Sequence, residues 1–117
     1  GRIERADSGA DKGWYVGPWN ADLTVSIRYA NKSVDEPHVH QQITEIYLVA
    51  RGTSDLRVEQ KTISLEPGDV IVIEPGEDHT FLFSSLDTFH FVAHLPGLTG
   101  TEAKDDRKHV CRTRLGL

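Results

Sequence analysis

Short runs of alternating apolar and polar residues, separated by Gly and Pro, fill most of the chain. In residues 23–29 every second side chain, from Leu23 to Tyr29, is apolar, which is the period of a half-buried β-strand. The run 70–73 is apolar at every position, as expected for an internal strand covered on both faces. No segment has the period of a convincing helix. Further strands are predicted at residues 45–50, 55–60, 62–65, 80–83, 88–94 and 109–115.

The breaks between these runs have the composition of tight turns. The triplet Glu-Pro-Gly occurs at residues 66–68 and again at 74–76, which places Pro and Gly at the two central positions of a type II turn. Another break follows at residues 96–97, which are Pro and Gly. Many short strands at a spacing of roughly 8–12 residues, with Gly and Pro between them, predict an all-β sandwich or barrel.

The length of 117 residues corresponds to about one domain. Residues 1–12 are polar and aperiodic, so we expect a flexible N-terminal arm followed by one barrel domain over residues 13–117. No apolar run approaches the roughly 20 residues that span a bilayer, so we expect no membrane partner. The first residues lack the apolar region of a signal peptide, although a start at Gly1 without Met is compatible with a targeting segment removed from a longer chain.

The charge and the cysteine content narrow the possible partners and compartment. A formal net charge of −5 argues against nucleic acid, whose binding draws on clustered Lys and Arg. A single cysteine, Cys111, precludes an intrachain disulfide and fits a reducing, cytoplasmic setting. We expect the Cys111 side chain to be buried or partly buried. One short basic stretch is expected to be a solvated strand face, and it comprises Arg107, Lys108, Arg112 and Arg114.

Three histidines and a glutamate are candidate ligands of a divalent transition metal. His38 and His40 are two residues apart, so on an extended segment both rings point to the same side. Glu45 lies five residues beyond His40, an odd offset that would turn it to the opposite face of a regular strand. The chain must therefore bend between residues 41 and 44 if Glu45 is to join the histidines. His79 follows a Pro-Gly turn that can direct it inward from a neighbouring strand.

The spacing of these residues resembles the two motifs of the cupin superfamily. The first motif reads His-x-His, three or four residues, Glu, six residues, Gly, and is matched by His38, His40, Glu45 and Gly52. The second reads Gly, five residues, Pro-x-Gly, two residues, His, three residues, Asn, and is matched in register by Gly68, Gly76 and His79. The resemblance covers about residues 24–95.

Three positions depart from the cupin motifs, and none of them is a ligand. Lys32 stands where a glycine usually opens the first motif, and Glu74 stands in place of the proline of the second. Phe83 replaces the closing asparagine, which makes that edge of the barrel apolar.

The resemblance implies a jelly-roll barrel of the double-stranded β-helix type. It also implies that His38, His40, Glu45 and His79 hold one divalent transition metal inside the barrel. Four protein ligands on an octahedral ion leave two positions open for water, a chelating substrate or dioxygen. Imidazole and carboxylate ligands suit Fe, Mn, Zn or Ni, and the sequence does not choose among these metals.

Other side chains near the predicted ligands have two interpretations each. Tyr47 lies two residues beyond Glu45 and should face the same interior, where it either fills the barrel or acts as a catalytic hydroxyl that orients the substrate or donates a proton. Phe81 has the same relation to His79 and should form a wall of the pocket. His90 and His94 are either support for the ligands or, the simpler expectation, residues of the outer face. Arg28 is either a surface residue or a clamp for a substrate carboxylate.

Two classes of function agree with these residues. The first is a metalloenzyme that acts on a small organic molecule chelated to the metal, as a dioxygenase, an isomerase or a lyase. The second is a non-catalytic module that binds or senses a small, sugar-like ligand.

By resemblance to the family we also expect a homodimer, for which the aromatic residues from Trp14 to Trp19 and the strand at 23–29 could supply the surface.

Overall fold

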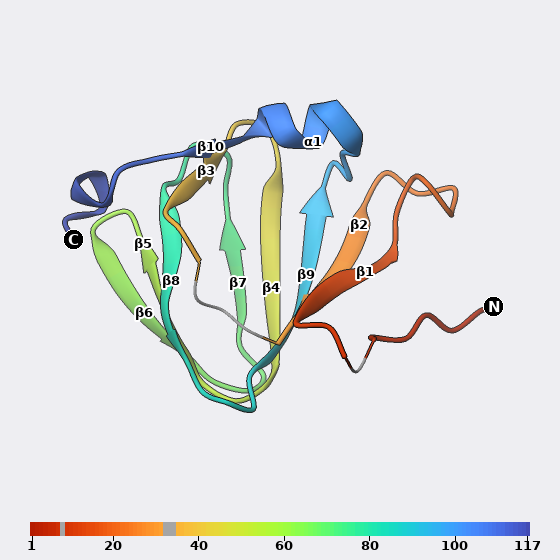
Figure 1. Cartoon of the computed structure of the whole chain (residues 1–117), viewed down its shortest axis with the longest axis horizontal. Coiled ribbons are helices and arrows are strands. Elements are labelled where there is room, and N and C mark those ends of the chain that lie inside the picture. Colours follow the sequence, from red (N-terminus) through yellow and green to blue (C-terminus); the bar gives the residue numbers. More distant parts are fainter. Residues whose placement is uncertain (8, 32–34) are drawn as a thin grey trace.

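The computed structural model describes residues 1–7, 9–31 and 35–117, and in these residues ten strands form two antiparallel five-stranded sheets that face each other (Figure 1). The first sheet contains, in spatial order, β1 (Lys12–Val16), β2 (Ser26–Ala30), β9 (Phe89–Leu95), β4 (Thr44–Arg51) and β7 (Val70–Ile73). The second contains β10 (Arg107–His109), β3 (His38–His40), β8 (His79–Ser84), β5 (Ser54–Val58) and β6 (Lys61–Leu65).

The chain passes repeatedly from one sheet to the other, which gives the jelly-roll barrel. β3, β5 and β8 belong to the second sheet, whereas β4, β7 and β9 belong to the first. The predicted all-β jelly-roll fold is confirmed. The predicted bend before Glu45 is confirmed as well, because β3 ends at His40 and β4 begins at Thr44 in the opposite sheet. Glu45 therefore faces the two histidines across the barrel and not along one strand.

An apolar core fills the space between the sheets. Its buried members come from both sheets, and they are Tyr47, Val49, Leu56, Leu65, Ile73, Phe81 and Val92. The candidate ligand Glu45 contacts this cluster through Tyr47, so the barrel has an apolar part and a polar part. Burial of the apolar side chains stabilises the fold, whereas the buried polar groups need partners within the barrel.

The two Glu-Pro-Gly turns form as predicted. Gly68 and Gly76 have positive φ angles of 93° and 87°, which a type II turn requires at its third residue. In each turn an i to i+3 backbone hydrogen bond closes the loop, from Asp69 to Glu66 and from Glu77 to Glu74. The prediction that residues 70–73 form an internal strand is wrong: β7 lies at the edge of the first sheet, and Val70 and Val72 are exposed.

The alternation in β2 left open which face of the strand points into the barrel, and the structure shows that the apolar positions lie on the outer side. Arg28 and Ala30 face the interior of the barrel, and Tyr29 is on the outer side of the sheet. Tyr29 is nevertheless buried, because the Tyr15 and Phe89 rings pack on it at centroid distances of 5.1 and 5.9 Å. The apolar face of β2 is therefore covered by aromatic rings that pack on the outside of the barrel. The Tyr29 hydroxyl also accepts a hydrogen bond of 2.8 Å from the backbone N–H of residue 7, in the N-terminal arm.

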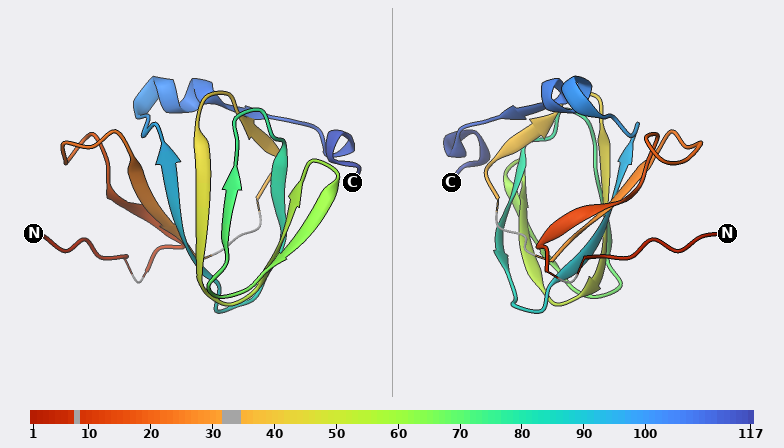
Figure 2. Two further views of the ribbon diagram at one scale, coloured as in Figure 1. Left: turned by 180° about the vertical axis from the view of Figure 1, so that it is seen from behind. Right: turned by 45° about the vertical axis from the view of Figure 1, so that its right-hand side comes forward.

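The C-terminal part differs most from the sequence prediction. Residues 100–106 form a short helix, α1 (Gly100–Asp106), where none was expected. The strand predicted at 109–115 is replaced by β10, which ends at His109, and by a single 3-10 turn, Arg112–Leu115. α1 and β10 lie across one end of the barrel (Figure 2). Among the described residues no helix has the length and apolar character to cross a membrane.

Candidate metal centre

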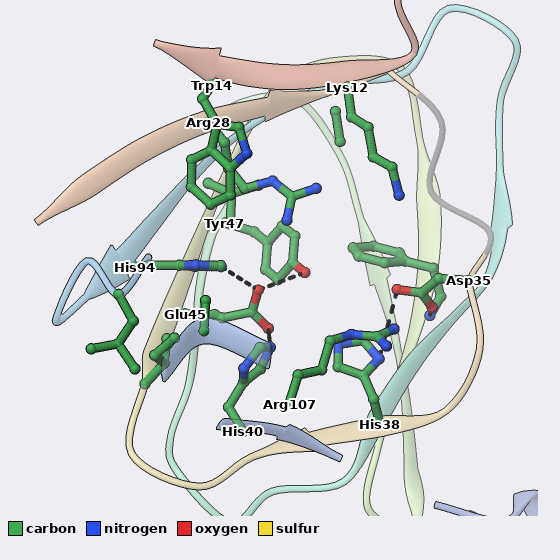
Figure 3. Close-up of a pocket in the computed structure, with 16 residues that line it drawn as sticks. Lys12, Trp14, Arg28, Asp35, His38, His40, Glu45, Tyr47, His94 and Arg107 are labelled. Carbon is green, nitrogen blue, oxygen red and sulfur yellow. Dashed lines mark hydrogen bonds and ion pairs between the residues drawn. The ribbon is translucent and has the colours of Figure 1, made fainter. Parts of the chain in front are cut away.

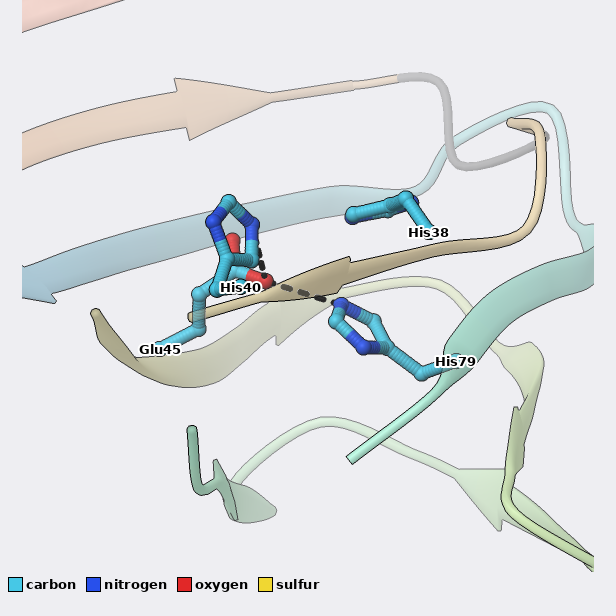
Figure 4. Close-up of side chains that lie close together, drawn as sticks. All are labelled: His38, His40, Glu45 and His79. Atoms are coloured by element: carbon cyan, nitrogen blue, oxygen red, sulfur yellow. Dashed lines mark hydrogen bonds and ion pairs between the residues drawn. The ribbon is translucent and has the colours of Figure 1, made fainter. Parts of the chain in front are cut away.

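The four predicted ligands converge inside the barrel (Figure 4). β3 supplies His38 and His40, β4 supplies Glu45, and β8 supplies His79 directly opposite His38. One ligand atom from each residue lies within 4.8 Å of the others, and all four side chains are buried. The spacing fits side chains that share one ion.

Each imidazole is fixed by its Nδ1 atom. His38 Nδ1 lies 2.8 Å from the carbonyl oxygen of Glu36, and His79 Nδ1 lies 2.9 Å from that of Glu77. His40 Nδ1 lies 2.9 Å from a carboxylate oxygen of Asp106. Carbonyl and carboxylate oxygens accept hydrogen bonds, so each Nδ1 carries the proton. The Nε2 lone pairs of the three rings are then free to bind a metal.

The contacts of Glu45 indicate that positive charge, from protons or from a metal ion, lies between the ligands. Its Oε1 is 2.9 Å from His79 Nε2 and 3.2 Å from His40 Nε2. Neutral rings protonated at Nδ1 would turn Nε2 lone pairs toward this acceptor oxygen, which is repulsive. A proton on each ring or one shared cation removes the conflict. Three imidazoles and a carboxylate are a donor set for a divalent transition metal, so the residues present fit such an ion.

The electrostatics hold Glu45 and His38 in metal-binding form. Burial opposes the charged form of Glu45, but hydrogen bonds from His40, His79 and His94 outweigh it and keep the pKa of the carboxyl well below its usual range. Burial, assisted by the nearby His79, lowers the pKa of His38 to about 3. Burial also opposes protonation of His40, but its hydrogen bonds to Glu45 and Asp106 outweigh that effect and raise its pKa. At neutral pH, Glu45 is therefore ionised and His38 is neutral, as metal ligands must be.

The second oxygen of Glu45 has two further partners. His94 Nε2 lies 2.8 Å from Oε2, and the Tyr47 hydroxyl donates a hydrogen bond of 3.3 Å to the same atom (Figure 3). These contacts orient the carboxylate so that Oε1 faces the imidazoles. Tyr47 is buried and faces the interior on the same side of β4 as Glu45, where the sequence placed it.

The expected position of His90 and His94 on the outer face is wrong. Both are buried, because β9 is an internal strand and its inward positions face the barrel interior. His94 pairs with Glu45 in the register of β4 and β9, which explains their contact. His90 stacks on the Phe81 ring in the core at 5.2 Å, and burial lowers its pKa to about 4.

Asp106 is a site residue that sequence reasoning missed. Its side chain is buried, one oxygen contacts His40 Nδ1, and the other accepts a 2.6 Å hydrogen bond from the backbone N–H of Gln42. It ends α1 immediately before β10, which pairs with β3 so that Arg107 lies opposite His40. No local motif marks this aspartate, because it meets its partner only through the pairing of strands more than 60 residues apart.

A cavity of about 410 Å³ is lined by three of the four candidate ligands, His38, His40 and Glu45 (Figure 3). Tyr47 and Phe81 are part of its wall, as predicted for Phe81. Arg28 also lines it, so the Arg28 side chain points into the barrel and is not a surface residue. Arg107 lines it too, so a solvated strand face is wrong for this member of the basic stretch.

Two residues named from the sequence do not contribute to this site. Cys111 is exposed, so the expectation of a buried thiol is wrong. Phe83 is half-exposed, away from the ligands. Lys32 lies outside the described residues.

The cupin domain model matches residues 26–94, which is more than half of the chain. The chain therefore belongs to the cupin family. No curated protein gives a significant match to the sequence.

Solved structures with the same fold include several proteins of low sequence identity. A substituted form of Streptomyces PAC13 with uridine is 14% identical, with a TM-score of 0.71, over 93% of this chain and 84% of that one. Pac13 is described as a nucleoside dehydratase. KdgF from Halomonas sp. is 17% identical, with a TM-score of 0.65, over 81% of this chain and 87% of that one. A structure from work on the DMSP lyases RdDddP and RnDddQII is 21% identical, with a TM-score of 0.60, over 86% of this chain and 53% of that one. At these identities the likeness shows the fold.

Proposed function

We propose that this cupin is a metal-dependent enzyme that transfers protons on a small organic substrate, as an isomerase or a lyase. The observation that supports the proposal is the pair of ionisable side chains, Tyr47 and His94, that border the cavity and touch Glu45. A site that only binds a ligand has no need of two such groups beside the metal ligands.

The metal would be held by His38, His40, Glu45 and His79. When bound, a divalent ion supplies a Lewis acid that polarises a substrate oxygen and stabilises the negative charge that develops on it. The barrel contributes positioning, because each ligand ring is fixed through its Nδ1 atom. The buried wall of the cavity excludes water and strengthens these interactions.

Tyr47 is the candidate proton donor. Burial, assisted by the negative charge of Glu45, raises the pKa of its hydroxyl well above the usual value, so the phenol keeps its proton at neutral pH. The 3.3 Å hydrogen bond to Glu45 is long enough to be exchanged for one to a substrate oxygen. His94 is the candidate base, because the residue lines the cavity and its Nε2 donates the 2.8 Å hydrogen bond that holds the ring on Glu45, which leaves the lone pair of Nδ1 to accept a proton.

The similar structures support proton transfer over oxygen chemistry. One of them is named a nucleoside dehydratase and another belongs to work on DMSP lyases, and both names describe eliminations. An elimination removes a proton and expels a leaving group, which needs a base and an acid on the two sides of the reacting bond. Tyr47 and His94 could supply these roles here.

The proposal is tested with protein reconstituted separately with Fe(II), Mn(II), Zn(II) and Ni(II). A screen of small hydroxy acids, sugars and nucleosides should find a compound that is consumed without uptake of dioxygen. For that compound, Tyr47→Phe and His94→Gln should each lower kcat about 100-fold at unchanged metal content. Tyr15→Phe is the matched control, since Tyr15 packs on Tyr29 and Phe91 outside the barrel. Stoichiometric oxygen uptake with turnover would instead identify a dioxygenase.

A non-catalytic binding module is the second candidate. The aromatic side chains of Trp14 and Phe81 in the cavity wall favour it, because such rings pack against the apolar faces of sugar-like ligands. This candidate predicts saturable binding of a compound that is recovered unchanged.

We also propose a homodimer and, from the single cysteine, action in a reducing cytoplasmic setting.

A further inference from the structure

We propose that the cavity binds its substrate through an anionic group, a carboxylate or a phosphate, held by Arg28 together with Lys12 and Arg107. The inference rests on the proposed function, because it names the class of substrate for the same cavity. All three cationic side chains line the cavity beside the metal ligands. In Figure 3, Arg28 and Lys12 extend into it from the side of β1 and β2, and Arg107 lies beside His38.

The guanidinium of Arg28 is placed by an aromatic ring and not by a carboxylate. Arg28 pairs with Trp14 in the register of β1 and β2, so both side chains face the cavity. The guanidinium carbon lies 5.2 Å from the centre of the Trp14 ring, a cation–π contact that orients the planar group. Among the described residues, none accepts a hydrogen bond from its buried Nε.

A buried guanidinium donor without an acceptor costs free energy, so a partner is expected. The planar fork of an arginine matches the oxygens of a carboxylate or a phosphate. Within the described part of the chain, no carboxylate forms an ion pair with Arg28, Lys12 or Arg107. Lys12 and Arg28 therefore keep their charge available to a ligand, whereas the charge of Arg107 is partly balanced by the nearby Asp35.

The carboxylates of the cavity are already engaged. Asp35 Oδ1 accepts hydrogen bonds of 2.7 Å from the Thr80 hydroxyl and 2.9 Å from the Phe81 backbone N–H. Glu45 is surrounded by imidazoles. Three cationic side chains thus face two carboxylates, and a bound divalent ion would increase the positive excess. The chain as a whole has a formal charge of −5, so this excess is a local property of the cavity. An anion would compensate it.

The test compares two ligands that differ only in charge. Metal-loaded protein is titrated with D-glucuronate, with the isosteric D-glucuronamide, and with inorganic phosphate at constant ionic strength. Calorimetry gives the affinity, and tryptophan fluorescence reports the site because Trp14 lies against Arg28. We expect glucuronate to bind at least about tenfold more tightly than glucuronamide, as a guanidinium–carboxylate pair predicts.

Substitutions assign this preference to the three cations. Arg28→Gln should reduce the difference between acid and amide to within about threefold, and Arg28→Lys should restore part of it. Lys12→Gln and Arg107→Gln should each have a smaller effect in the same direction, and they keep the test informative if Arg28→Gln fails to fold. Arg51→Gln is the matched control, because Arg51 is exposed and stacks on Phe89 away from the cavity.

Equal affinity for the acid and the amide would overturn the inference. A preference that survives the removal of all three cations, or a lack of binding of both glucuronate and phosphate, would do the same. Elemental analysis of the same samples separates this inference from the proposed metal site. Protein with a full equivalent of metal and no anion preference rejects only the anionic substrate, whereas Arg28-dependent anion binding without metal rejects only the metal.

Discussion

Asp106 is a buried side chain that would control the proposed metal centre without being a ligand. Its carboxylate contacts His40 Nδ1 at 2.9 Å and so fixes both the tautomer and the direction of the ring. Asp106→Asn keeps the shape but removes the charge, and we expect the metal affinity to fall about 10- to 100-fold. Competition with a chelator of known affinity measures the change. The exposed neighbour provides a control, since Asp105→Asn should leave the affinity unchanged. Equal effects of the two substitutions would remove this role.

His90 should make the stability of the metal-free protein depend on pH. Its folded pKa of about 4 lies below the unfolded value of about 6.5, so between these values the unfolded chain binds more protons. The contribution of His90 to the free energy of unfolding is therefore present above about pH 6.5 and is lost as the pH falls toward 4. Between pH 7 and pH 4.5 the loss is on the order of 2 kcal/mol.

Denaturant unfolding in the presence of a chelator measures this effect. His90→Gln removes the titrating group, so the stability of the variant should fall less than that of the wild type over the same pH range. His109→Gln is the control, because the His109 side chain is largely exposed. Parallel pH profiles of wild type and His90→Gln would contradict the assignment.

The ligands could be predicted from the sequence because they belong to spaced motifs, whereas their neighbours could not. The i, i+2 relation places Tyr47 on the side of Glu45. By contrast, Asp106 and Arg107 reach the site only through the pairing of β10 with β3. His94 belongs to β9, where the outward-facing residues Phe91 and Leu95 are apolar although exposed, so the alternation of the sequence did not show that His94 faces inward.

At the scale of elements, the passage from β3 to β4 is what assembles the centre. The two strands lie in different sheets, so His40 and Glu45 approach from opposite walls of the barrel. The sequence predicted the bend from the odd spacing of the ligands alone. It did not predict that Tyr29 faces outward, since its burial depends on rings from β1 and β9 that pack on the outside of the sheet.

Two turn glycines form a matched pair for testing local packing. Gly52 and Gly68 both have a positive φ, 76° and 93°, so alanine at either position is strained by about 1–2 kcal/mol. A Cβ at position 52 would also lie 2.7 Å from the Thr88 Cα, whereas at position 68 nothing lies within 4 Å. Gly52→Ala should therefore destabilise the protein by about 1–3 kcal/mol more than Gly68→Ala in denaturant unfolding. Equal losses would show that the contact with Thr88 is unimportant.

At the scale of the whole molecule, the outer face of the first sheet is the strongest candidate for a dimer interface. The strand register places Leu48 between Val70 and Phe91, and with Val72 these residues form an exposed apolar patch across β4, β7 and β9. The aromatic segment suggested by the sequence is less suitable, because Trp14 faces the cavity. Exposed apolar patches of this kind mark association surfaces.

We expect light scattering to give a dimeric mass at tens of micromolar, and the double substitution Val70→Glu with Val72→Glu to give the monomer. Leu86→Glu is the control, since Leu86 is fully exposed on a turn away from the patch. A monomeric wild-type protein at this concentration would exclude the dimer.

The account as a whole depends on one cation shared by the three imidazoles and Glu45. Elemental analysis after reconstitution under reducing conditions near neutral pH tests it most directly, with His79→Ala as the comparison. We predict about one equivalent of a transition metal per chain in the wild type and a strong loss in the variant. Less than about a tenth of an equivalent in the wild type would contradict the metal centre.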